Sequence, residues 1–231
     1  MRAMILAAGR GERMRPLTDH TPKPLLAVGG KPLIVWHLEK LAAAGFRDVV
    51  INHAHLGEQI EAKLGTGEKW GLTLHYSPEP PGALETAGGI ATALPLLGTA
   101  PFLVVNGDVW CDVDFAHFCR STVAQPDICP IAGARLLLVP NPAHHTRGDF
   151  SLDGKQVTLA RDGATFTYAG IGIYDPALFR DVPPHQPMKL RPLLDAAIAA
   201  GTLQGDIHSG RWVDVGTPAR LAELDQELQS A

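Results

Sequence analysis

The most constraining feature of the chain is its first segment, in which a short apolar run, residues 4–8, leads into a loop rich in glycine and arginine, residues 9–18. The pattern predicts a short buried strand that ends in a tight loop. Glycines let the backbone approach an anion closely, and arginines neutralise its charge. The segment therefore indicates a strand and loop that surround several phosphate groups with N–H donors and cations.

Two common phosphate-binding motifs are excluded at this loop. Gly9 and Gly11 do not form the dinucleotide fingerprint, because Met14 replaces the third glycine. No glycine and lysine followed by serine or threonine completes a P-loop. A nicotinamide-dependent oxidoreductase would also need a ribose-binding acid about twenty residues further on, and none is clear. The two glycines alone are equally typical of a plain turn between a strand and a helix.

Length, composition and charge favour a single globular domain that binds a small substrate. With 231 residues, 45% of them hydrophobic, the chain can bury one substantial core, and we expect a single domain over residues 1–231. A net charge of -4 argues against a general nucleic-acid binder. Cations nevertheless outnumber acids in the first 31 residues, which suits a small polyanionic substrate.

Cysteine use and hydropathy indicate a cytoplasmic protein. The three cysteines are odd in number and lack the spacing of a zinc site, so reduced thiols are expected at Cys111, Cys119 and Cys129. The first apolar run is too short for a signal peptide, and no stretch is apolar enough to span a bilayer. We therefore expect neither export nor membrane insertion.

Apolar strand-like runs alternate with helical periods, which predicts an α/β fold with a mostly parallel sheet. The expected strands are residues 49–51, 72–76, 102–105, 132–139, 166–174 and 212–215, with a hairpin turn at Asp153 and Gly154. The expected helices are residues 32–45, 60–64, 85–94 and 189–200 and a last helix capped by Thr217. Because ligands of such sheets bind beyond the carboxyl ends of the strands, the Gly9 loop and Asp108 should face one crevice.

The opening run LAAGRGERMRPLT, followed by PKPL, resembles the signature of the sugar-1-phosphate nucleotidyltransferases. This resemblance extends from residue 4 to the last helix. It implies a single Rossmann-like domain with a mostly parallel central sheet and a smaller sugar-binding β region. It also implies a reaction in which a sugar 1-phosphate attacks the α-phosphorus of a nucleoside triphosphate and pyrophosphate leaves.

The resemblance implies a Mg²⁺ site and a set of phosphate contacts. Asp108 in VVNGD and Asp214 in WVDVGTP match the metal aspartates of the family. An isolated aspartate after a strand is more often a turn cap, so the metal assignment depends on the pair. Lys23, held between two prolines, matches the lysine that contacts the reacting phosphates. Arg13 and Arg15 are both candidates for the pyrophosphate contact, and Arg13 is the better match to the family motif.

The resemblance also assigns nucleotide contacts. Besides Arg13 and Lys23, the implied residues of the opening segment are Leu6, Ala7, Ala8, Gly9, Gly11 and Glu12. The run PPGALETAGG resembles the loop that reads the base, where Gly82 would approach the flat ring. Many members carry a glutamine ahead of this glycine, whereas this chain has Ser77, Pro78 and Glu79. The resemblance therefore identifies the type of reaction better than it identifies the base of the nucleotide.

The implied sugar contacts are Glu85, Asn106, Gly148, Asp149, Tyr168 and Gly170. Glu85 is equally typical of a glutamate that stabilises the start of a helix. Tyr168 replaces an asparagine that is usual in the family, and the usual sugar-binding glutamate has no clean match, since Arg161 and Asp162 occupy its region. The sugar contacts are therefore less well defined than the phosphate contacts.

Within the family, the compact length and the opening segment most resemble the enzymes that transfer UMP from UTP to N-acetylmuramate 1-phosphate in peptidoglycan recycling. Arg161 is the candidate cation for the lactyl carboxylate of that sugar. The alternatives are a mannose- or glucose-1-phosphate nucleotidyltransferase that uses GTP or dTTP and a non-catalytic nucleotide-sugar sensor. We expect only small-molecule substrates as partners, with no nucleic acid or membrane, and a monomer or small homo-oligomer.

Several other residues are predicted to be structural. Adjacent histidines point apart in most backbones, so His144 and His145 indicate a surface loop rather than a metal site. Asp112 and Asp114 are typical of solvated turn and cap positions. The large aromatic residues within apolar periods are expected to pack in the core: Trp36, Phe46 and Trp70.

Overall fold

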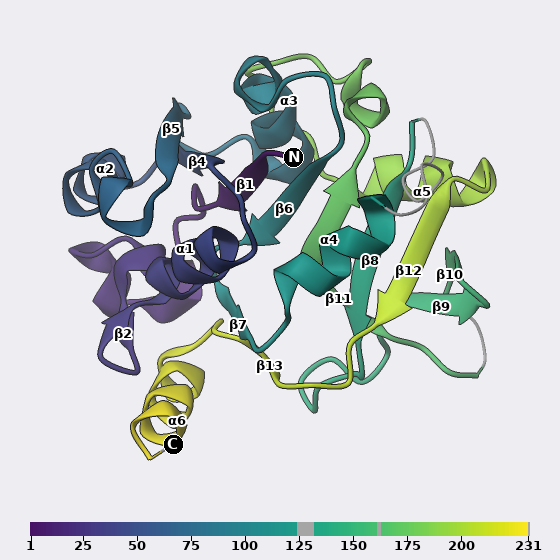
Figure 1. Cartoon of the computed structure of the whole chain (residues 1–231). Coiled ribbons are helices and arrows are strands. Elements are labelled where there is room, and N and C mark those ends of the chain that lie inside the picture. The colour runs from purple at the N-terminus through teal and green to yellow at the C-terminus, as the bar shows by residue number, and fades with distance from the viewer. Residues whose placement is uncertain (124–131, 161–162, 231) are drawn as a thin grey trace.

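The computed structural model describes residues 1–123, 132–160 and 163–230, so that Cys129, Arg161 and Asp162 lie outside the described residues. Its centre is a nine-stranded sheet (Figure 1). Across the sheet the strands are β5 (Thr73–Pro78), β4 (Asp48–His53), β1 (Ala3–Leu6), β6 (Phe102–Asn106), β11 (Thr167–Tyr174), β8 (Ala134–Val139), β12 (Leu203–Ile207), β10 (Gln156–Leu159) and β9 (Phe150–Asp153). Only β11 and β10 run against the other strands of this sheet, which confirms the expected mostly parallel arrangement.

Helices cover both faces of the sheet, as Figure 1 shows. On one face lie α1 (Leu33–Ala43), α2 (Gly57–Leu64) and α4 (Phe115–Val123), and on the other lie α3 (Glu85–Leu97) and α5 (Arg191–Ala199). In β1, Ile5 packs toward the first group and Met4 toward the second. Central parallel strands are therefore apolar on both sides, which explains why the sequence reads as continuous hydrophobic runs.

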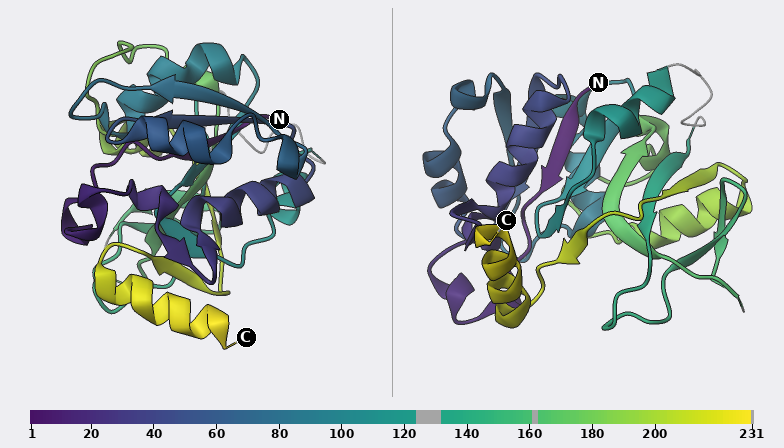
Figure 2. Two further views of the ribbon diagram at one scale, coloured as in Figure 1. Left: turned by 90° about the vertical axis from the view of Figure 1, so that its left-hand side faces the viewer. Right: turned by 60° about the horizontal axis from the view of Figure 1, so that its bottom comes forward.

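The last helix, α6 (Pro218–Gln229), packs away from the large sheet, beside the purple segment of the chain (Figure 2). It covers the small hairpin of β2 (Ala27–Val28) and β3 (Lys31–Pro32). Leu224 packs there against Val28 and Met14 in a third apolar cluster. The backbone N–H of Gly29 also donates to Asp225 Oδ1 at 2.7 Å.

A second small sheet joins the α6 region to the centre of the molecule. In it β13 (Trp212–Asp214) pairs antiparallel with β7 (Val109–Cys111). The register places Asp214 opposite Val109, the residue that follows Asp108. Two aspartates more than one hundred residues apart in sequence are thereby brought to neighbouring strands.

The expected strands and helices are all present, with shifted ends. The helix predicted over residues 85–94 continues to Leu97, past Pro95, and the strand predicted over residues 166–174 begins at Thr167. The turn at Asp153 and Gly154 joins β9 to β10, and Thr217 caps α6. The sequence interpretation had not included α4, β7, β12 or the short 3₁₀ turns η1 (Glu12–Met14), η2 (Leu17–Asp19), η3 (Lys23–Leu25), η4 (Glu68–Trp70) and η5 (Pro176–Phe179).

Gly88 provides a test of how α3 is seated. The N–H groups of Ala87 and Gly88 donate to the carbonyl of Met188 at 2.9 and 3.2 Å, and a Cβ at Gly88 would overlap the carbonyl oxygen of Gln186. Helix propensity alone predicts that Gly88→Ala stabilises the protein by about 1 kcal/mol. We expect the free energy of unfolding, measured with urea, to fall by about 1–3 kcal/mol instead, because the added methyl group would overlap backbone atoms.

The matched control is Gly9→Ala, whose Cβ would meet no atom within 4 Å. Its unfolding free energy should change much less than that of Gly88→Ala. A Gly88→Ala protein more stable than the parent would contradict this description of α3.

Candidate active site

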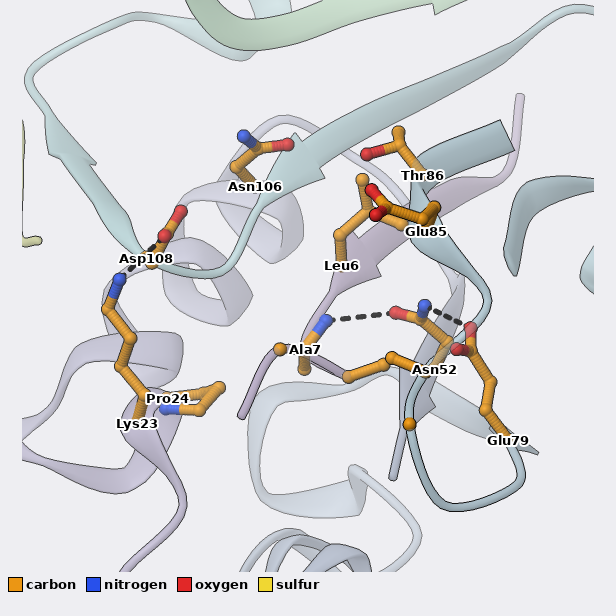
Figure 3. A pocket seen from close by; sticks show the side chains of 14 residues that line it. Leu6, Ala7, Lys23, Pro24, Asn52, Glu79, Glu85, Thr86, Asn106 and Asp108 are labelled. Atoms are coloured by element: carbon orange, nitrogen blue, oxygen red, sulfur yellow. Dashed lines mark hydrogen bonds and ion pairs between the residues drawn. The ribbon is translucent and has the colours of Figure 1, made fainter. Parts of the chain in front are cut away.

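The cavity that gathers many of the predicted site residues, called the main cavity below, lies at the carboxyl ends of β1, β4 and β6 and has a volume of about 360 Å³ (Figure 3). Its lining comes from segments far apart in sequence: Leu6, Ala7, Ala8, Gly9, Lys23, Pro24, Asn52, Glu79, Gly82, Ala83, Glu85, Thr86, Asn106 and Asp108. Gly9 and Asp108 thus face one crevice, as the rule for strand ends predicts.

Lys23 and Asp108 form an ion pair in this cavity. Lys23 is buried, with 7% of its surface exposed, and its Nζ donates to Asp108 Oδ2 at 2.6 Å. Pro22 and Pro24 flank it in the short turn η3 and restrict the backbone that carries it. A buried ammonium is costly without a partner, so the pair fixes the opening loop against the end of β6.

The glycine and arginine loop surrounds a second cavity of about 200 Å³. Gly11 has a φ of 69°, and its carbonyl accepts a hydrogen bond from the Thr18 hydroxyl at 2.8 Å. The residues around this cavity are Gly9, Gly11, Glu12, Arg13, Met14, Lys23, Asp108 and Gly216. Backbone and cations therefore face the same space, which fits a polyanion.

The three arginines of the loop differ in what they contact. Arg10 and Arg15 both pair with Asp19, at 3.4 and 2.8 Å. Among the described residues, Arg13 makes no side-chain hydrogen bond or ion pair, and it borders the second cavity. Of the three arginines, Arg13 is thus the one that borders the second cavity without a described side-chain partner.

Asp214 pairs with Val109, the first residue of β7, directly after Asp108. The N–H of Val215 donates to the carbonyl of Asp108 at 2.9 Å. Arg220 Nη1 donates to Asp214 Oδ2 at 2.8 Å, and His144 Nε2 lies 3.5 Å from the same oxygen. Each of the two carboxylates is therefore tied to a cation through its Oδ2 atom.

His37 fixes the segment that follows Asp108. Its Nε2 donates to the carbonyl of Val109 at 2.8 Å from within the core. Burial lowers the pKa of His37 to about 4, so the ring is neutral at physiological pH. A neutral, buried donor on α1 thus holds the start of β7 in place.

A chain of buried hydrogen bonds connects three strand ends around the cavity, and the sequence interpretation missed it. Asn52 Oδ1 accepts from the N–H of Ala7 at 2.9 Å, and Asn52 Nδ2 donates to Glu79 Oε1 at 2.6 Å (Figure 3). Glu79 Oε2 accepts from the N–H of Leu84 at 2.7 Å. Gly89 of α3 gives this carboxylate room, since a Cβ there would lie 2.5 Å from Glu79 Oε1. Asn52 could have been found from its place at the end of a strand next to β1.

The predicted base and sugar residues fall into two groups. Gly82, Glu85 and Asn106 line the main cavity. Gly148, Asp149, Tyr168 and Gly170 are not among its described lining residues. The second group lies instead on β11 and on the segment that leads into β9.

In the described part of the chain, the residues of the second group contact other protein groups. Asp149 Oδ2 accepts from the N–H of Tyr168 at 2.8 Å, and the hydroxyls of Tyr168 and Tyr174 are 2.7 Å apart. Burial raises the pKa of Tyr168. Gly170, with a φ of 72°, packs against Asn106, where a Cβ would lie 2.6 Å from the side-chain nitrogen. The absence of a side chain at Gly170 therefore leaves room for the side chain of Asn106, which lines the main cavity.

The residues predicted to be structural contact other protein groups where the structure describes them, although His144 also lies 3.5 Å from Asp214. His144 contacts Arg220, whereas His145 contacts Asp149 at 3.0 Å, so the two rings point to different partners. Asp114 accepts from the N–H of His117 at 2.9 Å at the start of α4, and Asp112 pairs with His208. Phe46 is buried, and Trp36 and Trp70 pack against apolar clusters.

Comparisons with known proteins agree with this geometry. The family model described as "Nucleotidyl transferase" matches residues 2–140. The N-acetylmuramate alpha-1-phosphate uridylyltransferase of Neisseria meningitidis serogroup B is 53% identical, over 96% of both chains. The protein of the same name from Caulobacter vibrioides is 36% identical, over 96% of this chain and 97% of its own.

The chain belongs to the nucleotidyltransferase family. Among solved structures, a putative glucose-1-phosphate thymidylyltransferase from Bacillus anthracis superposes with a TM-score of 0.86 at 23% identity and covers 100% of this chain and 96% of that one. That likeness concerns the fold alone. In the described part of this nucleotidyltransferase, no helix is both long and apolar enough to cross a bilayer.

Glu85 combines backbone strain with a place in the cavity. It is exposed, its φ is 57°, and in the described residues its carboxylate has no hydrogen-bond or ion-pair partner. Glycine adopts this conformation without the penalty that a side chain incurs. We therefore expect Glu85→Gly to leave the thermal midpoint unchanged or higher, while kcat/KM for pyrophosphate release falls about tenfold or more because an acceptor is lost.

The matched control is Ala132→Gly, because Ala132 has the same φ of 57° and lies outside the cavity lining. It should repeat the effect on the midpoint and keep the parent kcat/KM. A Glu85→Gly protein that melts lower and turns over normally would make Glu85 only a helix-start residue.

Proposed function

We propose that this nucleotidyltransferase transfers UMP from UTP to N-acetylmuramate 1-phosphate, yielding UDP-N-acetylmuramate and pyrophosphate, in peptidoglycan recycling in the cytoplasm. The observation that carries the proposal is the 53% identity, over 96% of both chains, with a relative of that name. The main cavity supports it, because a lysine and a carboxylate face a glycine loop there.

The proposed reaction needs no general base. A sugar-phosphate oxygen is already ionised at neutral pH, so it can attack the α-phosphorus directly while the bond to the β-phosphate breaks. The protein then contributes position and neutralisation of charge. Lys23 and Arg13 are the cations placed for this, Lys23 at the reacting phosphates and Arg13 at the departing pyrophosphate.

Asp108 and Asp214 fit a Mg²⁺ site. Each has one oxygen bound to a cation, and among the described residues its Oδ1 accepts no hydrogen bond. Mg²⁺ is typically held by one or two carboxylates, with phosphate oxygens and water completing its shell. In the described residues no group of three or more acidic, histidine or cysteine side chains gathers to hold a metal, so the remaining ligands would come from substrate and water. Bound there, Mg²⁺ would neutralise charge that develops on the phosphates.

The remaining contacts follow from the cavity lining. We assign the base to the space between Ala8 and Gly82 and the phosphates to the backbone of residues 9–12. Glu85 and Asn106 are the proposed sugar contacts. Gly148, Asp149, Tyr168 and Gly170 would act by shaping the segments around them, since their described side-chain contacts are internal.

A mannose- or glucose-1-phosphate nucleotidyltransferase is the alternative within the same mechanism. The two relatives named N-acetylmuramate alpha-1-phosphate uridylyltransferase are 53% and 36% identical over 96% of this chain, so uridylyl transfer is the better supported choice. A non-catalytic sensor would have no need for Lys23, Asp108 and Asp214 together. The substrates proposed as partners are the two small molecules alone, with the protein as a monomer or small homo-oligomer.

The metal assignment predicts a large loss of activity in protein that is still folded, although Asp108→Asn also removes the partner of the buried Lys23 and should lower the thermal midpoint. Asp108→Asn and Asp214→Asn should each lower kcat at saturating Mg²⁺ by at least about a hundredfold, because several kcal/mol of charge stabilisation disappear. The measurement is pyrophosphate release, with circular dichroism as a check on folding. Asp112→Asn is the matched control, since Asp112 pairs with His208 rather than facing the cavity. Near-parental turnover in both site variants would refute the assignment.

The substrate assignment predicts a preference for the acidic sugar. With UTP, kcat/KM should be about ten- to a hundredfold higher for N-acetylmuramate 1-phosphate than for N-acetylglucosamine 1-phosphate, because a matched donor to the lactyl carboxylate supplies that discrimination. Arg161→Ala should reduce the ratio between the two sugars, and Arg147→Ala, a change at an exposed arginine, serves as its comparison. Equal values for the sugars, or a preference for mannose 1-phosphate with GTP, would exclude N-acetylmuramate while leaving the mechanism intact.

A further inference from the structure

Arg220 occupies a place next to Asp214 that the proposed reaction does not explain. It lies in the first turn of α6, and its Nη1 donates to Asp214 Oδ2 at 2.8 Å. The side chains are largely buried, with 18% of Arg220 and 23% of Asp214 exposed. A guanidinium and a carboxylate this close and this shielded from water restrain one another's position.

The surrounding residues hold the guanidinium in place. Arg220 Nε lies 3.4 Å from the hydroxyl of Thr217, and Arg220 Nη1 lies 2.7 Å from His144 Nε2. The guanidinium also rests on Gly216, where a Cβ would overlap Arg220 Nη2. The guanidinium of Arg220 thus packs against the segment from Asp214 to Thr217, and it can do so because Gly216 has no side chain.

The arrangement at Asp214 repeats the arrangement at Asp108. Lys23 binds Asp108 through Oδ2, and Arg220 binds Asp214 through Oδ2. The Oδ1 atoms are the oxygens that remain for another ligand. A carboxylate with one oxygen already fixed loses less freedom when the other binds a cation.

We propose that Arg220 is a positioning residue for Asp214, which holds Oδ2 so that Oδ1 is presented to a divalent cation. The inference rests on the proposed metal role of Asp214. Partners that orient metal-binding carboxylates typically contribute about ten- to a hundredfold in metal affinity. Arg220 should therefore affect metal binding itself and not only turnover.

A second arginine allows the positioning role to be separated from the docking of α6. Arg211, next to β13, forms an ion pair with Glu227 of α6, and both side chains are about half exposed. This pair also joins α6 to the β13 region, but it does not touch Asp214. Apolar contacts of Leu221, Leu224 and Leu228 hold α6 independently of either arginine.

The test measures binding of Mn²⁺ together with α,β-methylene-UTP, whose bridging carbon prevents transfer. Free Mn²⁺ is followed by electron paramagnetic resonance, and the thermal midpoint without ligands checks folding. We expect Arg220→Met to raise the Mn²⁺ dissociation constant about ten- to a hundredfold. Arg220→Lys should recover part of the affinity because it keeps the charge, and Arg211→Ala should bind like the parent.

The methyl of Gly216→Ala would displace the guanidinium without removing a charge, and it would also lie 3.1 Å from Asp214 Oδ1. Adding Arg220→Met to Gly216→Ala should therefore weaken binding no further if Gly216→Ala acts through Arg220. Gly216→Ala should weaken Mn²⁺ binding even if Arg220→Met folds poorly. Parental affinity in Arg220→Met, or an equal loss in Arg211→Ala, would overturn the positioning role. Asp214→Asn distinguishes the two levels of inference: if it binds Mn²⁺ like the parent, the proposed metal role fails, and if only Asp214→Asn is weakened, the role of Arg220 alone fails.

Discussion

The ion pair between Lys23 and Asp108 is the contact on which the rest of the site depends. A buried ammonium needs a compensating charge, so the chain between β1 and α1 must fold back over the end of β6 to bring the two groups within 2.6 Å. That return path places Gly9 and Arg13 around the second cavity. One electrostatic requirement thus sets both the position of the loop and the polarity of the space that it encloses.

The edge of the sheet is held together by a polar network as well as by apolar packing. Asn52 and Glu79 link the ends of β1, β4 and β5 to the loop before α3. Every oxygen of this buried carboxylate and amide has a partner, and such fully satisfied groups rigidify a site. This wall of the main cavity is therefore fixed by the hydrogen bonds that connect the strand ends.

The C-terminal segment completes the site from a separate apolar cluster. Met14 of the opening loop and Leu224 of α6 pack together there, and β13 pairs with β7 beside Asp108. The second carboxylate thus reaches the first by strand pairing, while α6 supplies the arginine that binds it. The candidate active site is thus built from residues of the opening loop, of the central strands and of the C-terminal segment.

The sequence determined the features that depend on local pattern: the alternating elements, the Gly9 loop, Lys23 between prolines, and the aspartates at 108 and 214. The family resemblance, rather than the hydrophobic period, pointed to Glu85 and Asn106, which the structure places in the lining of the main cavity. Only the tertiary structure decided which polar groups meet across the sheet, since such contacts have no period in sequence. It alone showed that Tyr168 and Asp149 turn to internal partners, that Asn52 joins Glu79, and that Arg220 pairs with Asp214, because each depends on where distant segments pack.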